Sequence, residues 1–261
     1  ARELNNSETA FMFETDSPDY DIEVRFFTPT TEVPICGHAT IAAHYVRAKE
    51  RNMEGGTVVQ KTKAGILPVE VVRTLSDYSI TMTQGTPAVS APFGDTVRER
   101  IADALGIAHE EICREYPVAV ASTGHSKVMV PLYSNELLHG LRPDLQKLTK
   151  ISKQIECNGY YVFTLNPQNK ILVHGRMFAP AIGIAEDPVT GNANGPLGAY
   201  LVHFNILQEE DAPCFDFDIL QGEAIKRDGT MHVHVEKEHG APKLVQITGN
   251  AVIAFSTEIT I

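Results

Sequence analysis

One stretch of the sequence occurs twice in related form, and it limits the folds open to this chain. The first copy, Arg25–Lys49, begins with Arg-x-Phe-x-Pro and runs through Cys36-Gly37-His38 into a series of small residues. The second copy, Arg176–Phe204, repeats Arg-x-Phe-x-Pro, an apolar turn, a glycine (Gly191) and a series of small residues. Each copy predicts a strand, a turn and a helix that begins at the glycine, where free backbone N–H groups favour an anion. We predict two copies of one unit, with both helix starts facing one cleft.

The rest of the pattern favours antiparallel sheet. Residues 57–62, 66–74 and 78–84 predict three strands joined by short turns, typical of a meander. The chain does not read as regularly alternating strands and helices, which disfavours a nucleotide-binding parallel sheet. Gly191–Gly198 has the spacing GxxxGxxG, which matches neither a dinucleotide fingerprint nor a Walker motif. The sequence therefore predicts an α+β fold that binds no nicotinamide, flavin or ATP.

The domain organisation follows from length and from where the strand pattern restarts. A chain of 261 residues is long enough for two domains with full cores. We predict an N-terminal domain at 1–116 and a C-terminal domain at 117–249. The last predicted strand, Asn250–Ile259, has no counterpart in the second copy, so residues 250–261 are expected to complete the first domain.

Charge and cysteine usage exclude several classes of partner. The net charge is −11 and no run of Lys or Arg stands out, which argues against nucleic acid and anionic membrane as partners. The four cysteines show no CxxC spacing, and no apolar run is long enough to span a bilayer. We expect a cytoplasmic protein with free thiols.

Three side chains are candidates for proton transfer. Glu8 precedes an apolar segment, where burial would raise its pKa toward a useful range, whereas composition alone favours a solvated strand-end Glu. Asp187 stands just before the second helix, where it either caps backbone N–H groups or transfers a proton. His38 opens the first helix, where its pKa should be lowered and its imidazole neutral. It either hydrogen-bonds a carboxylate substrate or has a structural role.

Other polar residues leave alternatives open. Cys36 precedes the same helix and is either a base or nucleophile or simply buried. His232-x-His234 lies on one face of a strand, and without a third ligand in range we predict no metal there. Arg25 and Arg176 either clamp an anion or form ion pairs, and their matched positions favour a structural role.

Taken together, these residues resemble the PhzF-like phenazine-biosynthesis family, which has the diaminopimelate-epimerase-like fold, and its uncharacterised YddE-like branch in particular. The resemblance spans the whole chain and rests on Ser7-Glu8-Thr9, Thr28-Pro-x-x-Glu-Val-Pro-Ile-Cys-Gly-His38-Ala-Thr, Gly124-His125-Ser126 and Glu186-Asp187-Pro-Val-Thr-Gly191-Asn192. It implies two pseudo-symmetric domains, each an antiparallel barrel-like sheet around a central helix, with the site between them. Members usually carry a few dozen residues before the equivalent of Ala1, so we expect opening strands of the first barrel to be absent from this chain. Relatives also suggest a homodimer.

The resemblance also implies a chemistry. In the family's phenazine enzyme, the Glu that corresponds to Glu8 moves a proton between two carbons of a dihydro-hydroxyanthranilate without metal or organic cofactor. His38 and Asp187 would assist Glu8. The implied substrate-binding residues are Ser7, Cys36, Gly37, His125, Thr190, Gly191 and Asn192.

Two departures from related enzymes shape the prediction. Asn192 replaces a family Ser, which puts the phenazine intermediate itself in doubt as substrate. Related epimerases use a Cys at each helix start, whereas the second start has Thr190, whose hydroxyl is too weak an acid for a two-thiol mechanism. We predict a cofactor-independent isomerase acting on a small carboxylate-bearing metabolite. A Cys36-dependent amino-acid racemase or epimerase and a non-catalytic metabolite-binding protein remain alternatives.

Overall fold

The chain folds into two compact units. A computed structural model describes residues 1–4, 6–207 and 212–258. The first unit comprises Ala1–Thr83 and the segment that begins at Thr248, and the second comprises Gln84–Ile247. Among the residues described, no helix is both long and apolar enough to cross a lipid bilayer.

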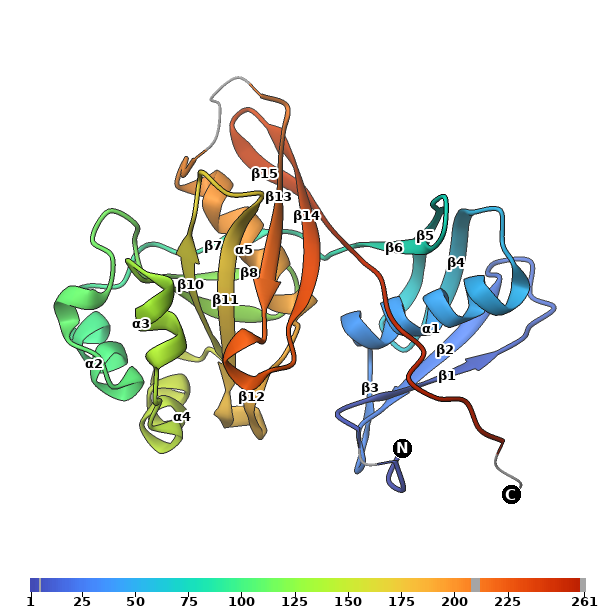
Figure 1. Ribbon diagram of the computed structural model, residues 1–261, viewed down its shortest axis with the longest axis horizontal. Coiled ribbons are helices and arrows are strands. Elements are labelled where there is room, and N and C mark those ends of the chain that lie inside the picture. The colour runs from blue at the N-terminus through green and yellow to red at the C-terminus, as the bar shows by residue number, and fades with distance from the viewer. Residues whose placement is uncertain (5, 208–211, 259–261) are drawn as a thin grey trace. The chain divides into compact units, whose positions relative to one another are not determined.

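The first unit is a sheet with one helix lying across it (Figure 1). Its strands lie in the order β1-β2-β4-β5-β6, and β3 pairs with β2. Neighbours are antiparallel except β2 and β4, which are parallel. The strands are β1 (Thr9–Phe13), β2 (Ile22–Phe27), β3 (Glu32–Val33), β4 (Gly56–Thr62), β5 (Gly65–Arg73) and β6 (Tyr78–Thr83).

Helix α1 (Gly37–Arg51) contacts β1, β5 and β6. Ala39 and Ala48 are among its buried residues, and such small side chains let the helix lie close to the sheet. The helix ends at Asn52, whose left-handed backbone (φ 47°) directs its N–H to carbonyl groups of the last turn. The close packing keeps the first turn of α1 near the segment that enters β1.

The second unit is a larger sheet that curves around a buried helix (Figure 1). Its strands follow the order β15-β14-β13-β11-β10-β9-β8-β7, with β12 paired to β11. Helix α5 (Gly191–His203) contacts β7, β8 and β9 toward one end of this order and β13 and β14 toward the other, so the sheet wraps around it. The strands are β7 (Ala88–Val89), β8 (Ala119–Ser122), β9 (Ser126–Pro131), β10 (Tyr160–Leu165), β11 (Ile171–Ala179), β12 (Ile184–Asp187), β13 (Cys214–Gln221), β14 (Gly229–Glu238) and β15 (Ala241–Gly249).

Three further helices pack on the side of this sheet that faces away from α5. They are α2 (Asp95–Leu105), α3 (Asn135–Gly140) and α4 (Leu145–Ile155), and the short 3-10 turns are His109–Glu111, Pro180–Ile182 and Glu223–Ile225. Leu105 and Leu148 share a buried apolar cluster with Tyr160 and Val162 of β10. The alternate residue Tyr161 bonds to Asn194 of α5, so β10 is buried on both faces.

Two expectations about the ends of the units differ from the structure. The division falls after Thr83 rather than near Tyr116, because β7 pairs with β8 and α2 packs on α4. The described residues of the predicted strand Asn250–Ile259, which are 250–258, form neither helix nor strand, and 259–261 lie outside the described residues. An alternating apolar pattern becomes a strand only where another strand pairs with it, and here Val252 is 88% exposed.

The predicted duplication is visible in the local structure of each unit. Arg25 lies over the ring of Phe27 (5.1 Å) and Arg176 over that of Phe178 (5.0 Å). Arg25 Nε donates to Glu32 at 2.9 Å, and Arg176 donates through Nε and a terminal nitrogen to Glu186 at 2.9 and 2.7 Å. Both arginines are thus held in ion pairs beside an aromatic ring, which is the structural role that their matched positions favour.

Candidate active site

Helix α1 begins at Gly37, as the sequence predicts. Cys36 precedes it in extended backbone (φ −143°, ψ 120°), and its side chain does not cap the helix. The Cys36 carbonyl accepts bonds from the N–H and the hydroxyl of Thr40, at 3.0 and 2.7 Å. Because the first turn contains no acidic residue, the positive end of the helix dipole is not neutralised from within the turn. This helix start is suited to an anion.

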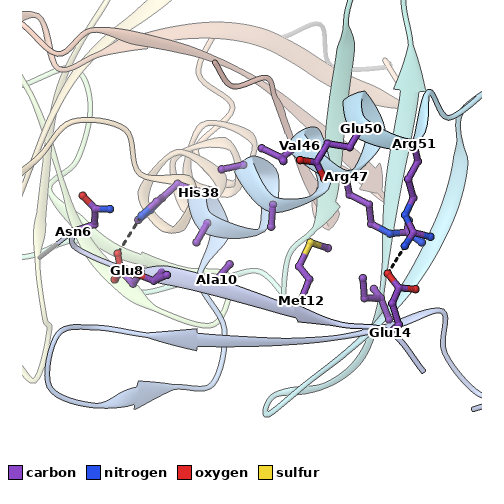
Figure 2. A pocket seen from close by; sticks show the side chains of 15 residues that line it. Asn6, Glu8, Ala10, Met12, Glu14, His38, Val46, Arg47, Glu50 and Arg51 are labelled. Carbon is purple, nitrogen blue, oxygen red and sulfur yellow. Dashed lines mark hydrogen bonds and ion pairs between the residues drawn. The ribbon is translucent and has the colours of Figure 1, made fainter. Parts of the chain in front are cut away.

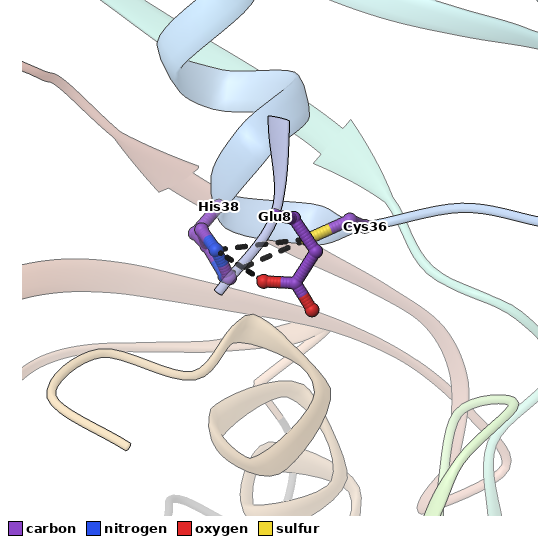
Figure 3. Close-up of side chains that lie close together, drawn as sticks. All are labelled: Glu8, Cys36 and His38. Carbon is purple, nitrogen blue, oxygen red and sulfur yellow. Dashed lines mark hydrogen bonds and ion pairs between the residues drawn. The ribbon is translucent and has the colours of Figure 1, made fainter. Parts of the chain in front are cut away.

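Glu8 and His38 meet beside this helix start, together with Cys36 (Figure 3). Glu8 Oε2 forms an ion pair with His38 Nε2 at 3.1 Å, and Cys36 Sγ lies 3.7 Å from each ring nitrogen of His38. Ser7 Oγ is 3.4 Å from His38 Nε2. The structure thus brings together four of the predicted site residues, Ser7, Glu8, Cys36 and His38, at the start of α1.

The electrostatics of Glu8 differ from the expectation. Its hydrogen bond and charge interaction with His38 lower the pKa of Glu8, and burial, which acts in the opposite direction, is outweighed. Desolvation alone would raise the pKa of Glu8, and the sequence prediction rested on that effect alone. With the pKa lowered, Glu8 is a carboxylate at neutral pH and can accept a proton, as a weaker base than an unperturbed glutamate.

Glu8 and His38 line one end of a pocket of about 480 Å³. The pocket lies between β1 and α1, and Figure 2 shows the labelled side chains of both elements facing it. Alanines of α1 and Met12 of β1 make its middle apolar, and Arg47 and Arg51 lie toward its other end. A carboxylate therefore stands at one end of a pocket whose middle is apolar.

Helix α5 begins at Gly191, again as predicted, and Thr190 precedes it. The Thr190 hydroxyl donates to Asp187 Oδ2 at 2.5 Å and does not cap the helix. Gln221 Nε2 donates to the Asp187 carbonyl and to Thr190 Oγ1, and Asn194 Nδ2 donates to the Thr190 carbonyl at 2.9 Å. Asp187, Thr190 and Gly191 are thus held together, with Asn192 in the first turn, by a largely buried hydrogen-bond network.

Some polar residues of the second unit were not anticipated. Gln221 and Asn194 are fully buried in the network around Thr190. Asn194 follows Thr190 by four residues, as Thr40 follows Cys36, and this repeat was a signal that the sequence carried. Lys127 is 5% exposed although it directly follows the Gly124-His125-Ser126 motif. Nothing in an apolar strand pattern points to a buried lysine.

Lys127 links two predicted site residues electrostatically. Burial lowers the pKa of Lys127, and the charge of Asp187 acts against that shift. Burial also lowers the pKa of His125, with the charge of Lys127 adding to the shift. Asp187, Lys127 and His125 therefore belong to one electrostatically coupled group in the second unit.

Two groups of side chains among the described residues have donor atoms close enough for a metal ion. One is Glu8, Cys36 and His38, and the other is Cys214, Asp216 and His234, with donor atoms within 4.8 Å of one another in each group. The sequence prediction against a metal at His232-x-His234 rested on the lack of a third ligand. The structure supplies candidate ligands from β13.

The whole chain matches one family of known proteins. The family's sequence model, described as phenazine biosynthesis-like protein, matches residues 1–257. The chain belongs to the phenazine biosynthesis-like family. An uncharacterised isomerase of Clostridium acetobutylicum is 52% identical over 100% of this chain and 86% of its own length. The uncharacterised isomerase YddE of Escherichia coli K12 is 48% identical over 99% and 86%.

Further relatives and solved structures extend the comparison. The trans-2,3-dihydro-3-hydroxyanthranilate isomerase of Pseudomonas chlororaphis is 29% identical over 97% of this chain and 84% of its own. A PhzF family structure from Bacillus anthracis superimposes with a TM-score of 0.88 at 30% identity, covering 100% and 87% of the two chains. A hydroxyproline epimerase from Agrobacterium vitis shares the fold (TM-score 0.60, 12% identity, 93% and 71% covered). The predicted family and α+β fold class are confirmed, and the chain is an isomerase of this family.

Proposed function

We propose that this isomerase moves a proton between two carbons of a small carboxylate-bearing metabolite, with Glu8 as general base and then general acid. The observation that carries the proposal is the ion pair of Glu8 with His38 at the uncapped start of α1, on the wall of a pocket. A carboxylate kept ionised, beside N–H groups that can stabilise negative charge, is what proton abstraction next to a carbonyl or double bond requires.

The proposed reaction has two steps. The Glu8 carboxylate takes a proton from a substrate carbon, the C–H bond breaks, and its electron pair moves into the adjoining double bond or carboxylate. The N–H groups of Gly37 and His38 and the imidazole stabilise the resulting charge. Protonated Glu8 then returns the proton to a different carbon, so atoms and charge balance without a metal or organic cofactor.

The second helix start has a proposed binding role. Asp187, Thr190, Gly191, Asn192 and His125 keep their predicted assignments, Asp187 to proton transfer and the others to substrate binding. The rigid network around Thr190 supports binding, since it fixes the backbone N–H groups of α5 in place. That both helix starts bind one substrate stays a prediction from the sequence.

The substrate class is proposed from chemistry and from the relatives. The Pseudomonas chlororaphis relative is an isomerase of trans-2,3-dihydro-3-hydroxyanthranilate, which is a carboxylate. This compound is therefore the first probe, followed by small aromatic and amino acids. The family Ser that is Asn192 here leads us to expect a different ring or substituent.

Glu8→Gln tests the proposal. The variant keeps the size of the side chain but cannot accept the proton, so exchange of substrate hydrogen with deuterated water, followed by NMR, should slow by about 10²–10⁴-fold. Glu70→Gln, at an exposed glutamate of β5, is the matched control and should exchange at the unchanged rate. Unchanged exchange in Glu8→Gln removes Glu8 from the role.

A second candidate function places the proton on Cys36 as in a racemase. The contact of Cys36 Sγ with His38 favours it, whereas the burial of Cys36, at 6% exposure, disfavours an accessible thiolate. Fast, selective alkylation of Cys36 by iodoacetamide with loss of activity would support the thiol mechanism. Slow alkylation, with full activity in Cys36→Ser, supports Glu8.

A third reading is a metabolite-binding protein without turnover. Thermal stabilisation by a small acid, with no hydrogen exchange in that acid, would support binding alone. The expectations of a cytoplasmic location and of a homodimer stay predictions.

A further inference from the structure

The outward face of strands β13 and β14 carries a row of metal-binding side chains. Residues alternate along the two strands, so that Phe217 and Val233 are buried while Asp216 and His234 point to the other face. The strands pair antiparallel with Asp216 opposite His234 and Asp218 opposite His232, and Cys214 stands two residues before Asp216. Five side chains from both strands therefore share one face: Cys214, Asp216, Asp218, His232 and His234.

Three donor atoms of this row lie close together. Cys214 Sγ, an Asp216 oxygen and a His234 ring nitrogen lie within 4.8 Å of one another. His232 Nε2 is 3.2 Å from Asp216 Oδ1, whereas nitrogen and oxygen ligands of a tetrahedral zinc ion lie about 3.4 Å apart. The bond of His234 Nδ1 to Asp216 Oδ1, at 2.7 Å, has to lengthen by roughly 0.7 Å to match that separation.

His232 adds an imidazole beside these three donors. Its Nδ1 lies 2.8 Å from Asp218 Oδ1 while its Nε2 lies 3.2 Å from Asp216 Oδ1. The ring is thus flanked by two carboxylates on the same face of the strands.

We propose that Cys214, Asp216 and His234 bind a divalent transition metal ion, with His232 and Asp218 beside them on the same face. The donor set of one thiolate, one carboxylate and one imidazole matches zinc and excludes magnesium and calcium, which take oxygen ligands. The row lies on the second unit, apart in sequence from the helix starts assigned to the proposed function, so the site stands or falls independently of it.

The test is a titration of the purified chain with zinc chloride, by calorimetry and by competition with a coloured chelator. Cys214→Ser, Asp216→Asn and His234→Gln should each weaken zinc binding at least tenfold. Substitution with cobalt(II) should give a thiolate charge-transfer band that disappears in Cys214→Ser. Circular dichroism shows whether each variant is folded.

Two control variants separate this site from other ligands. His239→Gln changes a histidine in the turn after β14, and Cys36→Ser changes the thiol of the other candidate group. Both should keep the zinc affinity and the cobalt band assigned to Cys214. Zinc affinity that is the same in Cys214→Ser and His234→Gln as in the unchanged protein overturns the proposal, as does failure of the unchanged protein to bind zinc.

Discussion

Replacing His38 by glutamine tests how the Glu8 carboxylate is kept ready to accept a proton. The imidazole makes the largest contribution to lowering the pKa of Glu8, and burial acts against it. His38→Gln removes the charge and leaves the burial, so the pKa of Glu8 should rise. A smaller fraction of Glu8 is then ionised at a given acid pH. The acidic limb of the profile of kcat/KM against pH should therefore move to higher pH.

The magnitudes distinguish this effect from loss of the fold. The side chains of His38 and Glu8 are 38% and 17% exposed, and ion pairs near the surface contribute roughly 0.2–1 kcal/mol to stability. Loss of a donor to developing negative charge costs on the order of 10²–10³ in kcat, or about 3–4 kcal/mol. His38→Ala, which lacks any donor, should lose that much, and His38→Gln, which keeps an N–H donor, should lose less. Both should lose more activity than stability.

The assay is kcat/KM as a function of pH on the substrate identified by deuterium exchange. The unchanged protein, His38→Gln and His38→Ala are compared, with His239→Gln as a control histidine in an exposed turn of the second unit. Both His38 variants should show the shifted limb, and the control should not. A limb that stays in place, or moves to lower pH, in His38→Gln would refute the account of Glu8.

Three predictions concern stability. The pKa of Glu8 is lowered from 4.5, so above that pH the free energy of unfolding should be higher in the unchanged protein than in Glu8→Gln, by at most about 1 kcal/mol. The difference should vanish as the pH falls through the lowered pKa. Urea unfolding at neutral and acid pH checks this, and a difference that grows in acid contradicts it. Gly198→Ala places a Cβ 2.8 Å from two valine methyl carbons of β14 and should lower the free energy of unfolding, measured in urea, by about 1–3 kcal/mol. Gly94→Ala, whose Cβ has no atom within 4 Å, is the control and should not lower it. Equal stabilities of the two variants would count against the packing argument. Lys127→Met should raise the free energy of unfolding by about 1 kcal/mol at neutral pH, because the buried ammonium is disfavoured. This gain should shrink as the pH rises through the lowered pKa of Lys127. Thermal unfolding checks this, and a destabilised variant would mean that the favourable interactions of Lys127 outweigh the cost of its burial.

The sequence predicted the features that local rules determine. The starts of α1 and α5 follow from Gly37 and Gly191, since a glycine before small residues favours a close-packed helix start. The ion pairs of Arg25 and Arg176 follow from their matched places in the repeat. These features depend on residues within about ten positions of one another, so the pattern along the chain was enough.

Features that depend on distant residues were not predictable in this way. The pKa of Glu8 depends on His38, which is brought close only by the packing of α1 on β1. Gln221 reaches Thr190 from another strand, and the side chains that face His234 come from β13. The division after Thr83 depends on the pairing of β7 with β8 across the intervening helix α2. In each case the deciding partner is set by tertiary structure.

The two copies of the repeat differ in the side chains at their helix starts. Both keep a polar residue four positions after the N-cap that bonds to the N-cap carbonyl, Thr40 to Cys36 and Asn194 to Thr190. At α5 the hydroxyl of the N-cap residue Thr190 donates a hydrogen bond to Asp187 and accepts one from the amide of the buried Gln221. Neither a hydroxyl nor an amide exchanges protons readily near neutral pH. At α1 the corresponding place holds a thiol, an imidazole and a carboxylate, which are side chains of the kinds that act as general acids and bases. The duplicated scaffold therefore supplies similar backbone geometry twice, but it places a carboxylate–imidazole–thiol group only at α1, and this asymmetry favours a single-base isomerase over a two-base epimerase.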